Sequence, residues 1–316
     1  MIAAAKRMAK KQPEKLSHRF FPSKLLLFGE HTINKGSMGI AIPSHRFEGF
    51  FKQEEQLTGS KAASNQSLEL LSNYIIFHKK LSQNIDTDRL LMDVESGLYF
   101  DSTIPHGYGL GSSGALAAAV LYNYASAKFN EKNIAAAREI LADIESYYHG
   151  KSSGLDALVS FINAPVLISE KGIEKIELPK VKTPVLKWFL VDTNKSRSTA
   201  NYVNHFLKKH EDKQFAKDIA DSLVPAVNHC IDLLLQSKSE KLFKAFAILS
   251  QLQMNLMPEF IPQELHSAWR DGLKTNNFLL KICGAGGGGF MLGVCKADVE
   301  PAQFFSSHKV VEIMLS

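Results

Sequence analysis

Residues 105–114, with the sequence PHGYGLGSSG, contain several small residues that could together bind an anion. Glycines let backbone N–H groups converge on one anion, and the start of a following helix adds unsatisfied donors and a positive dipole end. The alanine-rich stretch at 115–128 predicts such a helix. The adjacent hydroxyls of Ser112 and Ser113 could bind phosphate oxygens or a hydrated Mg²⁺. A serine-capped helix after a flexible turn is the simpler alternative, but four glycines and two serines within residues 107–114 favour a phosphate-binding loop.

Two better-known nucleotide motifs match this chain only in part. Residues 109–114 fit the pattern GxGxxG, but the dinucleotide fold needs a strand running directly into the first glycine. Here residues 104–106 intervene, and the segment at 134–148 after the first helix is again helical in pattern. The sequence at 149–152, HGKS, ends like a Walker A loop, but Glu145 stands where its first glycine is required. Both interpretations are therefore rejected.

A second glycine cluster occupies residues 284–289, with five glycines in six positions. It joins two apolar runs at 278–282 and 290–294, both of which predict strands. A simple hairpin turn needs one or two glycines, and each additional one costs about 0.5–1 kcal/mol relative to alanine in regular structure. We therefore expect the backbone of this loop to approach a ligand closely.

Charged residues near these loops could act in acid–base or metal chemistry. Asp156 follows a tight turn and precedes an apolar segment, so it is either a general base or an ordinary turn aspartate. Glu145 and His149 lie four residues apart on one helix face and are either metal ligands or an exposed pair. Lys24 lies at the start of an apolar strand, and Glu30, with the adjacent His31, at its far end could face a substrate.

The pattern of apolar residues predicts a mixture of helices and short strands. A polar, proline-containing connection at 171–182 is the best candidate for a domain boundary. Helices are expected at 68–81, 115–128 and 134–148, and over most of 199–260 with breaks at 225, 237–239 and 258. Strands are expected at 24–29, 40–43, 91–94, 158–168, 185–191, 278–282 and 290–294.

Composition excludes several classes of protein. The chain has 316 residues, of which 45% are apolar and 22% charged, as in globular proteins. Its net charge of +5 comes from residues 1–19, with six basic residues and one acidic, so no basic face for nucleic acid is expected. This basic head is either a solvated terminus or an amphipathic targeting segment. No apolar stretch is long enough for a membrane span. The three cysteines are widely spaced, which predicts neither a disulfide framework nor a zinc site. This pattern is typical of a protein of the reducing cytoplasm.

Taken together, three segments resemble the motifs of the GHMP small-molecule kinase superfamily, in the same order. They are residues 22–32 (PSKLLLFGEHT), 105–118 and 281–290 (KICGAGGGGF). Within the superfamily the chain looks most similar to mevalonate kinases. Residues 149–156 (HGKSSGLD) resemble their HGxPSGxD segment, with Ser152 where proline is usual, and residues 193–199 resemble TNTKxxRxT.

The resemblance implies an α+β, two-domain GHMP kinase fold with the active site in the cleft between the domains. The expected parts are a flexible head at 1–19, an ATP-binding domain at 20–175 and a C-terminal domain at 176–316. The implied reaction is phosphorylation of a small alcohol by ATP with Mg²⁺, most similar to the conversion of mevalonate to 5-phosphomevalonate in isoprenoid precursor synthesis. Phosphomevalonate, galactose or other sugars remain alternative substrates, and a non-catalytic binding protein remains an alternative function. A cytoplasmic homodimer would be typical of the family.

The resemblance also implies a role for each residue that matches a motif. Asp156 would be the general base, and Lys24 would stabilise charge on the transferred phosphoryl group. Ser113 and Glu145 would hold Mg²⁺. The implied phosphate-binding residues are Gly107, Gly109, Leu110, Gly111, Ser112 and Ser113. The implied substrate-facing residues are Glu30, His31, Thr199, Gly286 and Gly287.

Overall fold

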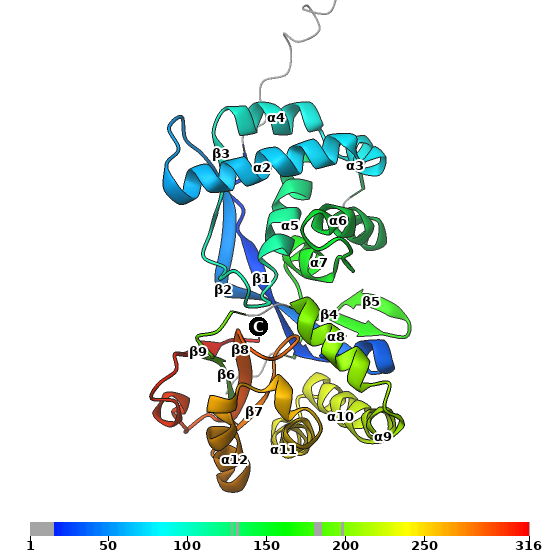
Figure 1. Ribbon diagram of the computed structural model, residues 1–316, viewed down its shortest axis with the longest axis vertical. Helices are drawn as coiled ribbons and strands as arrows, with labels where there is room; N and C mark the ends of the chain where they lie inside the picture. The colour runs from blue at the N-terminus through cyan, green and yellow to red at the C-terminus, as the bar shows by residue number, and fades with distance from the viewer. Residues whose placement is uncertain (1–15, 128, 131–132, 180–184, 197–198, 316) are drawn as a thin grey trace, which may run out of the picture.

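The computed structural model describes residues 16–127, 129–130, 133–179, 185–196 and 199–315. Most of the basic head therefore lies outside the described residues, as does the end of the proposed boundary region. Two antiparallel sheets form the framework (Figure 1). The first contains β1 (Phe21–Phe28), β2 (Gly39–Gln53), β3 (Leu98–Ser102), β4 (Val166–Ser169) and β5 (Gly172–Lys175). The second contains β6 (Leu186–Asp192), β7 (Phe278–Ile282), β8 (Phe290–Lys296) and β9 (Val310–Ile313).

Helices pack around both sheets, and those from the first part of the chain lie around the first sheet. Those of the first part cover the upper half of Figure 1: α2 (Gly59–Phe77), α3 (Lys79–Asn84), α4 (Thr87–Glu95), α5 (Ser112–Tyr124), α6 (Ile134–His149) and α7 (Leu155–Ile162). Those of the second part are α8 (Thr199–Lys209), α9 (Lys213–Asp218), α10 (Val224–Leu235), α11 (Ser239–Leu256) and α12 (His266–Thr275). Short 3₁₀ turns occur at Ile33–Lys35, Pro258–Phe260, Gln263–Leu265 and Pro301–Phe304, and a π-helical turn at Ile219–Leu223.

The two sheets share one apolar core. The ring of Phe28, at the end of β1, lies 6.2 Å from the ring of Trp188 on β6 and 6.1 Å from that of Phe246 on α11. All three side chains are buried. Aromatic rings contribute large apolar area to such a core, so the end of β1 is fixed against the second sheet.

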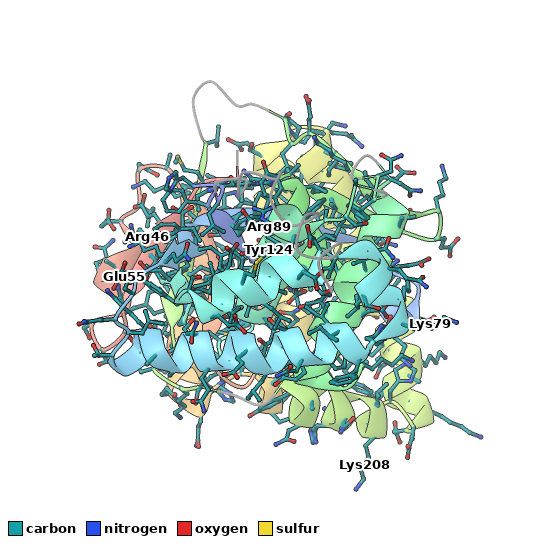
Figure 2. The ribbon with its side chains drawn as sticks, turned by 90° about the horizontal axis from the view of Figure 1, so that it is seen from above. Arg46, Glu55, Lys79, Arg89, Tyr124 and Lys208 are labelled. Carbon is teal, nitrogen blue, oxygen red and sulfur yellow. The ribbon has the colours of Figure 1, made fainter. Side chains whose placement is uncertain are left out.

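Helix α5 is anchored at its C-terminal end, far from the glycine loop that begins it. The hydroxyl of Tyr124 donates a hydrogen bond to Asp93 of α4 (2.8 Å). The guanidinium group of Arg89, also on α4, lies 5.1 Å from the Tyr124 ring and donates to the carbonyl of Asn123 (3.0 Å). Figure 2, which looks onto these helices from above, shows Arg89 and Tyr124 next to each other. These contacts hold the axis of α5, and hence the position of its first turn.

Most predicted elements are present, but two predicted strands are wrong. The segment predicted as a strand at 158–168 contains helix α7 and only then strand β4. Gly154, with φ of 69°, begins α7, and the helix buries nearly its whole circumference. An apolar run without an exposed face cannot be distinguished from a buried strand by periodicity. The strand predicted at 91–94 is part of α4, whose first turn is capped by the side chain of Asp86.

The other differences concern helix boundaries. The helix predicted at 68–81 begins earlier and is divided at His78 into α2 and α3. No break occurs at Pro225, because proline is tolerated in the first turn of a helix, here α10. The chain breaks instead at 210–212, before α9, where the side chain of Asp212 caps the new helix. The predicted breaks at 237–239 and 258 are confirmed.

The three cysteines, all of which the structure describes, form no disulfide bond, and all are buried. Among the described residues, no helix combines the length and the apolar character that crossing a membrane requires.

Candidate active site

The centre of the candidate site is an ion pair between the first strand and helix α7. The ammonium group of Lys24 lies 2.8 Å from Oδ1 of Asp156. The lysine side chain is 8% exposed, whereas 34% of the aspartate side chain is exposed. The backbone N–H of Lys24 also donates to the carbonyl of Leu110 (2.9 Å). The glycine loop is therefore bonded to the edge of β1 at the residue that carries the lysine.

Glycines in this loop permit a close approach between two helices. Gly107, Gly109 and Gly111 all have φ values of 72–76°, in the left-handed region that favours glycine. A Cβ atom at Gly111 would lie 3.2 Å from the Cβ of Asp156, and one at Gly114 would lie 2.7 Å from the backbone of α7. The first turn of α5 thus begins beside Asp156. No described side chain caps this turn, so its N–H groups can bind an anion.

A network of oxygen atoms lies on the same side of α5. Oγ of Ser113 is 2.9 Å from Nε2 of His149 and 3.5 Å from Oε1 of Glu145. Oε2 of Glu145 accepts a hydrogen bond from Ser152 (2.8 Å). Glu145 is only 3% exposed. Burial and, secondarily, the negative charge of Asp156 raise the pKa of Glu145 to about 7.

Glu30, predicted to face the substrate, is instead buried against a lysine. Its carboxylate pairs with the ammonium group of Lys281 on β7, which is completely buried and also donates to the carbonyl of Ile282 (2.6 Å). Burial raises the pKa of Glu30, and the charge of Lys281 opposes this effect. The sequence contained a signal for this pair, since Lys281 interrupts an otherwise apolar strand.

His31 and the second glycine loop lie together. His31, with φ of 62°, donates from Nε2 to the carbonyl of Ala285 (3.1 Å), and its ring stacks on Phe206. A Cβ atom at Gly286 would lie 2.6 Å from the carbonyl oxygen of Phe260, and one at Gly287 would lie 1.8 Å from the ring of Tyr202. At these two glycines the backbone therefore lies close to Phe260 and Tyr202 of the same chain, and an approach to a ligand stays a prediction.

The two glycine loops also contact each other. A Cβ atom at Gly289 would lie 2.6 Å from the carbonyl oxygen of Tyr108, and the Tyr108 ring lies 5.2 Å from that of Phe290. Thr193 donates two hydrogen bonds to the carbonyl of Gly289, from its N–H (2.9 Å) and its hydroxyl (2.8 Å). The segments 105–114, 193–195 and 284–289 thus form one surface. Thr199 is exposed at the start of α8.

The arrangement as a whole brings together a lysine–aspartate pair, an uncapped helix start and a buried carboxylate. Residues 107–113, Lys24, Glu145 and Asp156 lie close together. Glu30 pairs with Lys281, and the nearby charge of Lys24 also acts to lower its pKa. Sequence reasoning missed three contributors, namely the hydroxyl of Ser152, the buried Lys281 and the ring of Tyr108.

The chain is similar in sequence to known kinases. The family model described as GHMP kinases N terminal domain matches residues 74–163. The mevalonate kinase of Archaeoglobus fulgidus is 24% identical over 289 residues, which cover 90% of this chain and 94% of that protein.

Solved structures with the same fold include enzymes for different substrates. L. major mevalonate kinase in complex with R-mevalonate has a TM-score of 0.65 at 18% identity and covers 96% of this chain and 99% of its own. Streptococcus pneumoniae phosphomevalonate kinase has a TM-score of 0.60 at 16% identity and covers 91% and 94%. The resemblance predicted from the glycine loops is therefore confirmed: residues 74–163 match the GHMP kinase model, and the chain is similar in sequence and in fold to members of that family.

Proposed function

We propose that the protein transfers the γ-phosphoryl group of ATP to the hydroxyl group of mevalonate, giving 5-phosphomevalonate. The observation that carries this proposal is the Lys24–Asp156 pair beside the uncapped start of α5. Phosphoryl transfer requires mainly positioning and stabilisation of charge. A partly exposed carboxylate, a buried cation and a set of free N–H groups supply both. The similarity to a curated mevalonate kinase over 90% of the chain supports the choice of acceptor.

In this proposal each group of the site has one task. The alcohol binds with its hydroxyl at Asp156, whose carboxylate accepts the hydroxyl proton as the oxygen attacks phosphorus. The ammonium group of Lys24 stabilises the negative charge that accumulates on the transferred group. The N–H groups of residues 107–113 bind the nucleotide phosphates. His31 and the loop at 284–289 lie on the acceptor side and exclude water from it.

The residues present fit a Mg²⁺ ion that is shared with the nucleotide. Within the described part of the chain, no three His, Cys, Asp or Glu side chains form a metal-binding group. Mg²⁺ in nucleotide sites is usually held by one or two carboxylates together with phosphates and water, rather than by a cage of protein ligands. Glu145 and Ser113, which offer hard oxygen donors 3.5 Å apart, would hold the ion. When bound, Mg²⁺ would neutralise charge on the β- and γ-phosphates.

The domain organisation and location belong to the same proposal. We assign residues 20–175 to an ATP-binding domain and residues 176–316 to a C-terminal domain, since each range contains one complete sheet. Three buried cysteines without a disulfide suit the reducing cytoplasm.

The experiment that tests the function is ADP release from Mg²⁺–ATP with a panel of acceptors, followed by the product mass. The panel contains mevalonate, phosphomevalonate, diphosphomevalonate, galactose and homoserine. We expect turnover on mevalonate alone. Turnover on another acceptor would show that the substrate is a different one of those used in the superfamily. ATP binding without any turnover would favour a non-catalytic protein.

The base is tested by Asp156→Asn, which keeps the size of the side chain but cannot accept the proton. Loss of a positioned general base lowers the rate by about 10²–10⁴-fold, and ATP affinity should remain. Asp101→Asn is a matched control, because it breaks a lysine–aspartate pair of 2.6 Å on the surface. Near-normal turnover of Asp156→Asn would contradict the assignment.

A further inference from the structure

Ser152 lies in the turn between α6 and α7 and contacts the carboxylate of Glu145. The distance from its Oγ to Oε2 of Glu145 is 2.8 Å. Two other bonds fix the serine itself. Its backbone N–H donates to Oγ of Ser146 (3.2 Å), and the N–H of Gly154 donates to Oγ of Ser152 (3.0 Å). Ser146 in turn donates its proton to the carbonyl of Ala142 (2.7 Å). The turn is therefore bonded to the last turns of α6.

These bonds determine the direction in which the Ser152 proton points. A backbone N–H can only donate, so Oγ of Ser152 must accept the bond from Gly154. Its own proton is then left for Oε2 of Glu145, which can only accept when ionised. The carboxylate is held by this oxygen, and the other oxygen, Oε1, faces Oγ of Ser113 at 3.5 Å.

Ser113 is fixed in a similar way from the opposite side. Nε2 of His149 lies 2.9 Å from its Oγ, and Ser113 itself belongs to the first turn of α5. The two oxygens that face each other, Oε1 of Glu145 and Oγ of Ser113, are thus each oriented by a second residue. Outer partners of this kind orient metal ligands in many metal sites.

We propose that Ser152 is the positioning residue for Glu145, holding Oε2 so that Oε1 stays beside Ser113, where the two residues would hold Mg²⁺. This inference rests on the proposed function, because that function supplies the Mg²⁺–nucleotide. Proline, which is usual at this position in the segment that residues 149–156 resemble, has neither a hydroxyl group nor an N–H. The serine is therefore a feature of this chain and performs a task that proline cannot.

The test compares binding of ADP with Mg²⁺ and binding of ADP in EDTA, measured by calorimetry on the full-length protein without an acceptor. Loss of an outer partner lowers metal affinity by about 10–100-fold. We expect Ser152→Ala to weaken Mg²⁺–ADP binding by about tenfold or more and to leave binding of ADP in EDTA unchanged. Ser152→Thr, which keeps the hydroxyl, should bind Mg²⁺–ADP like the parent. The matched control is Ser153→Ala, because Ser153 is an exposed neighbour whose hydroxyl contacts the N–H of Leu155.

Several results would overturn the inference. An unchanged Mg²⁺–ADP affinity in Ser152→Ala would do so, as would an equal loss with and without Mg²⁺, which indicates a structural role for the turn. A parent protein that binds ADP equally well with and without Mg²⁺ would also overturn it. The acceptor panel remains a separate readout. Mg²⁺ could raise the affinity for ADP only when Ser152 is present, while the protein does not phosphorylate mevalonate. That result would support the positioning role and contradict the proposed substrate.

Discussion

The substitution Glu145→Gln should stabilise the metal-free protein at alkaline pH while weakening the site. Glu145 is almost fully buried, and its pKa of about 7 lies well above the ordinary value of 4.5. Each pKa unit corresponds to about 1.4 kcal/mol. At pH 8 the carboxyl is ionised in both the folded and the unfolded state, so the folded state bears a cost of about 3 kcal/mol. Glutamine carries no charge and avoids this cost.

The sign of the pH dependence follows from the raised pKa. A carboxyl that binds its proton more tightly in the folded state favours folding at low pH, and this contribution is lost as the pH rises from about 4.5 to about 7. At pH 5.5 the folded protein keeps the proton, so the advantage of glutamine shrinks to about 1 kcal/mol. The difference between the two pH values should therefore be about 2 kcal/mol.

The assay is urea unfolding in EDTA at pH 8.0 and pH 5.5, followed by the fluorescence of the buried Trp188 and Trp269. Glu139→Gln is a matched control on the same helix, because its carboxylate is exposed and pairs only at the surface, with Lys80 (3.1 Å). We expect the control to change the free energy of unfolding by less than about 0.5 kcal/mol. The reasoning is refuted if Glu145→Gln gives the same change at both pH values or is less stable than the parent at pH 8.

Two further predictions concern packing. Gly111→Ala should lower kcat by about tenfold or more, because it introduces left-handed strain of about 1–2 kcal/mol and a Cβ atom 3.2 Å from the Cβ of Asp156, which displaces the base. Its control is Gly36→Ala, which has φ of 93° but no heavy atom within 4 Å; equal kcat values for the two variants would contradict a displacement of Asp156. Lys281→Met should reduce the free energy of unfolding by about 3–5 kcal/mol, since it leaves the buried Glu30 without its cation. The double variant Lys281→Met/Glu30→Gln should recover part of this loss in the same urea titration, and no recovery would argue against the ion pair as the cause.

The phosphate loop could be predicted from the sequence because its chemistry is local. The glycines that adopt positive φ and the serine at which α5 begins are neighbours in the sequence, so they can be recognised together. The same holds for α6, whose apolar stripe and terminal Gly150 mark both its face and its end. Strand β1 is also local, since residues 25–28 form an apolar run.

Other features depend on partners that are distant in sequence. The partner of Glu30 could not be identified from the sequence, because Lys281 is 251 residues away and the interrupted apolar strand signals a buried charge without showing what pairs with it. The helix at 155–162 could not be predicted either. Because it is packed on most sides, its sequence lacks the polar face that gives a surface helix its period. The glycines at 286 and 287 lie against Phe260 and Tyr202 of the same chain. Their approach to a substrate stays a prediction.

The Glu30–Lys281 pair has a consequence for the order in which the chain is completed during synthesis. Translation proceeds at about 5–20 residues per second, so Lys281 is added roughly 10–50 seconds after Glu30. An unpartnered carboxylate is not stable in an apolar interior. The end of β1 therefore cannot reach its final packing while the early part of the chain emerges, although every strand of the first sheet has been made by residue 175. The core around the end of β1 is therefore completed only when the C-terminal part of the chain supplies Lys281.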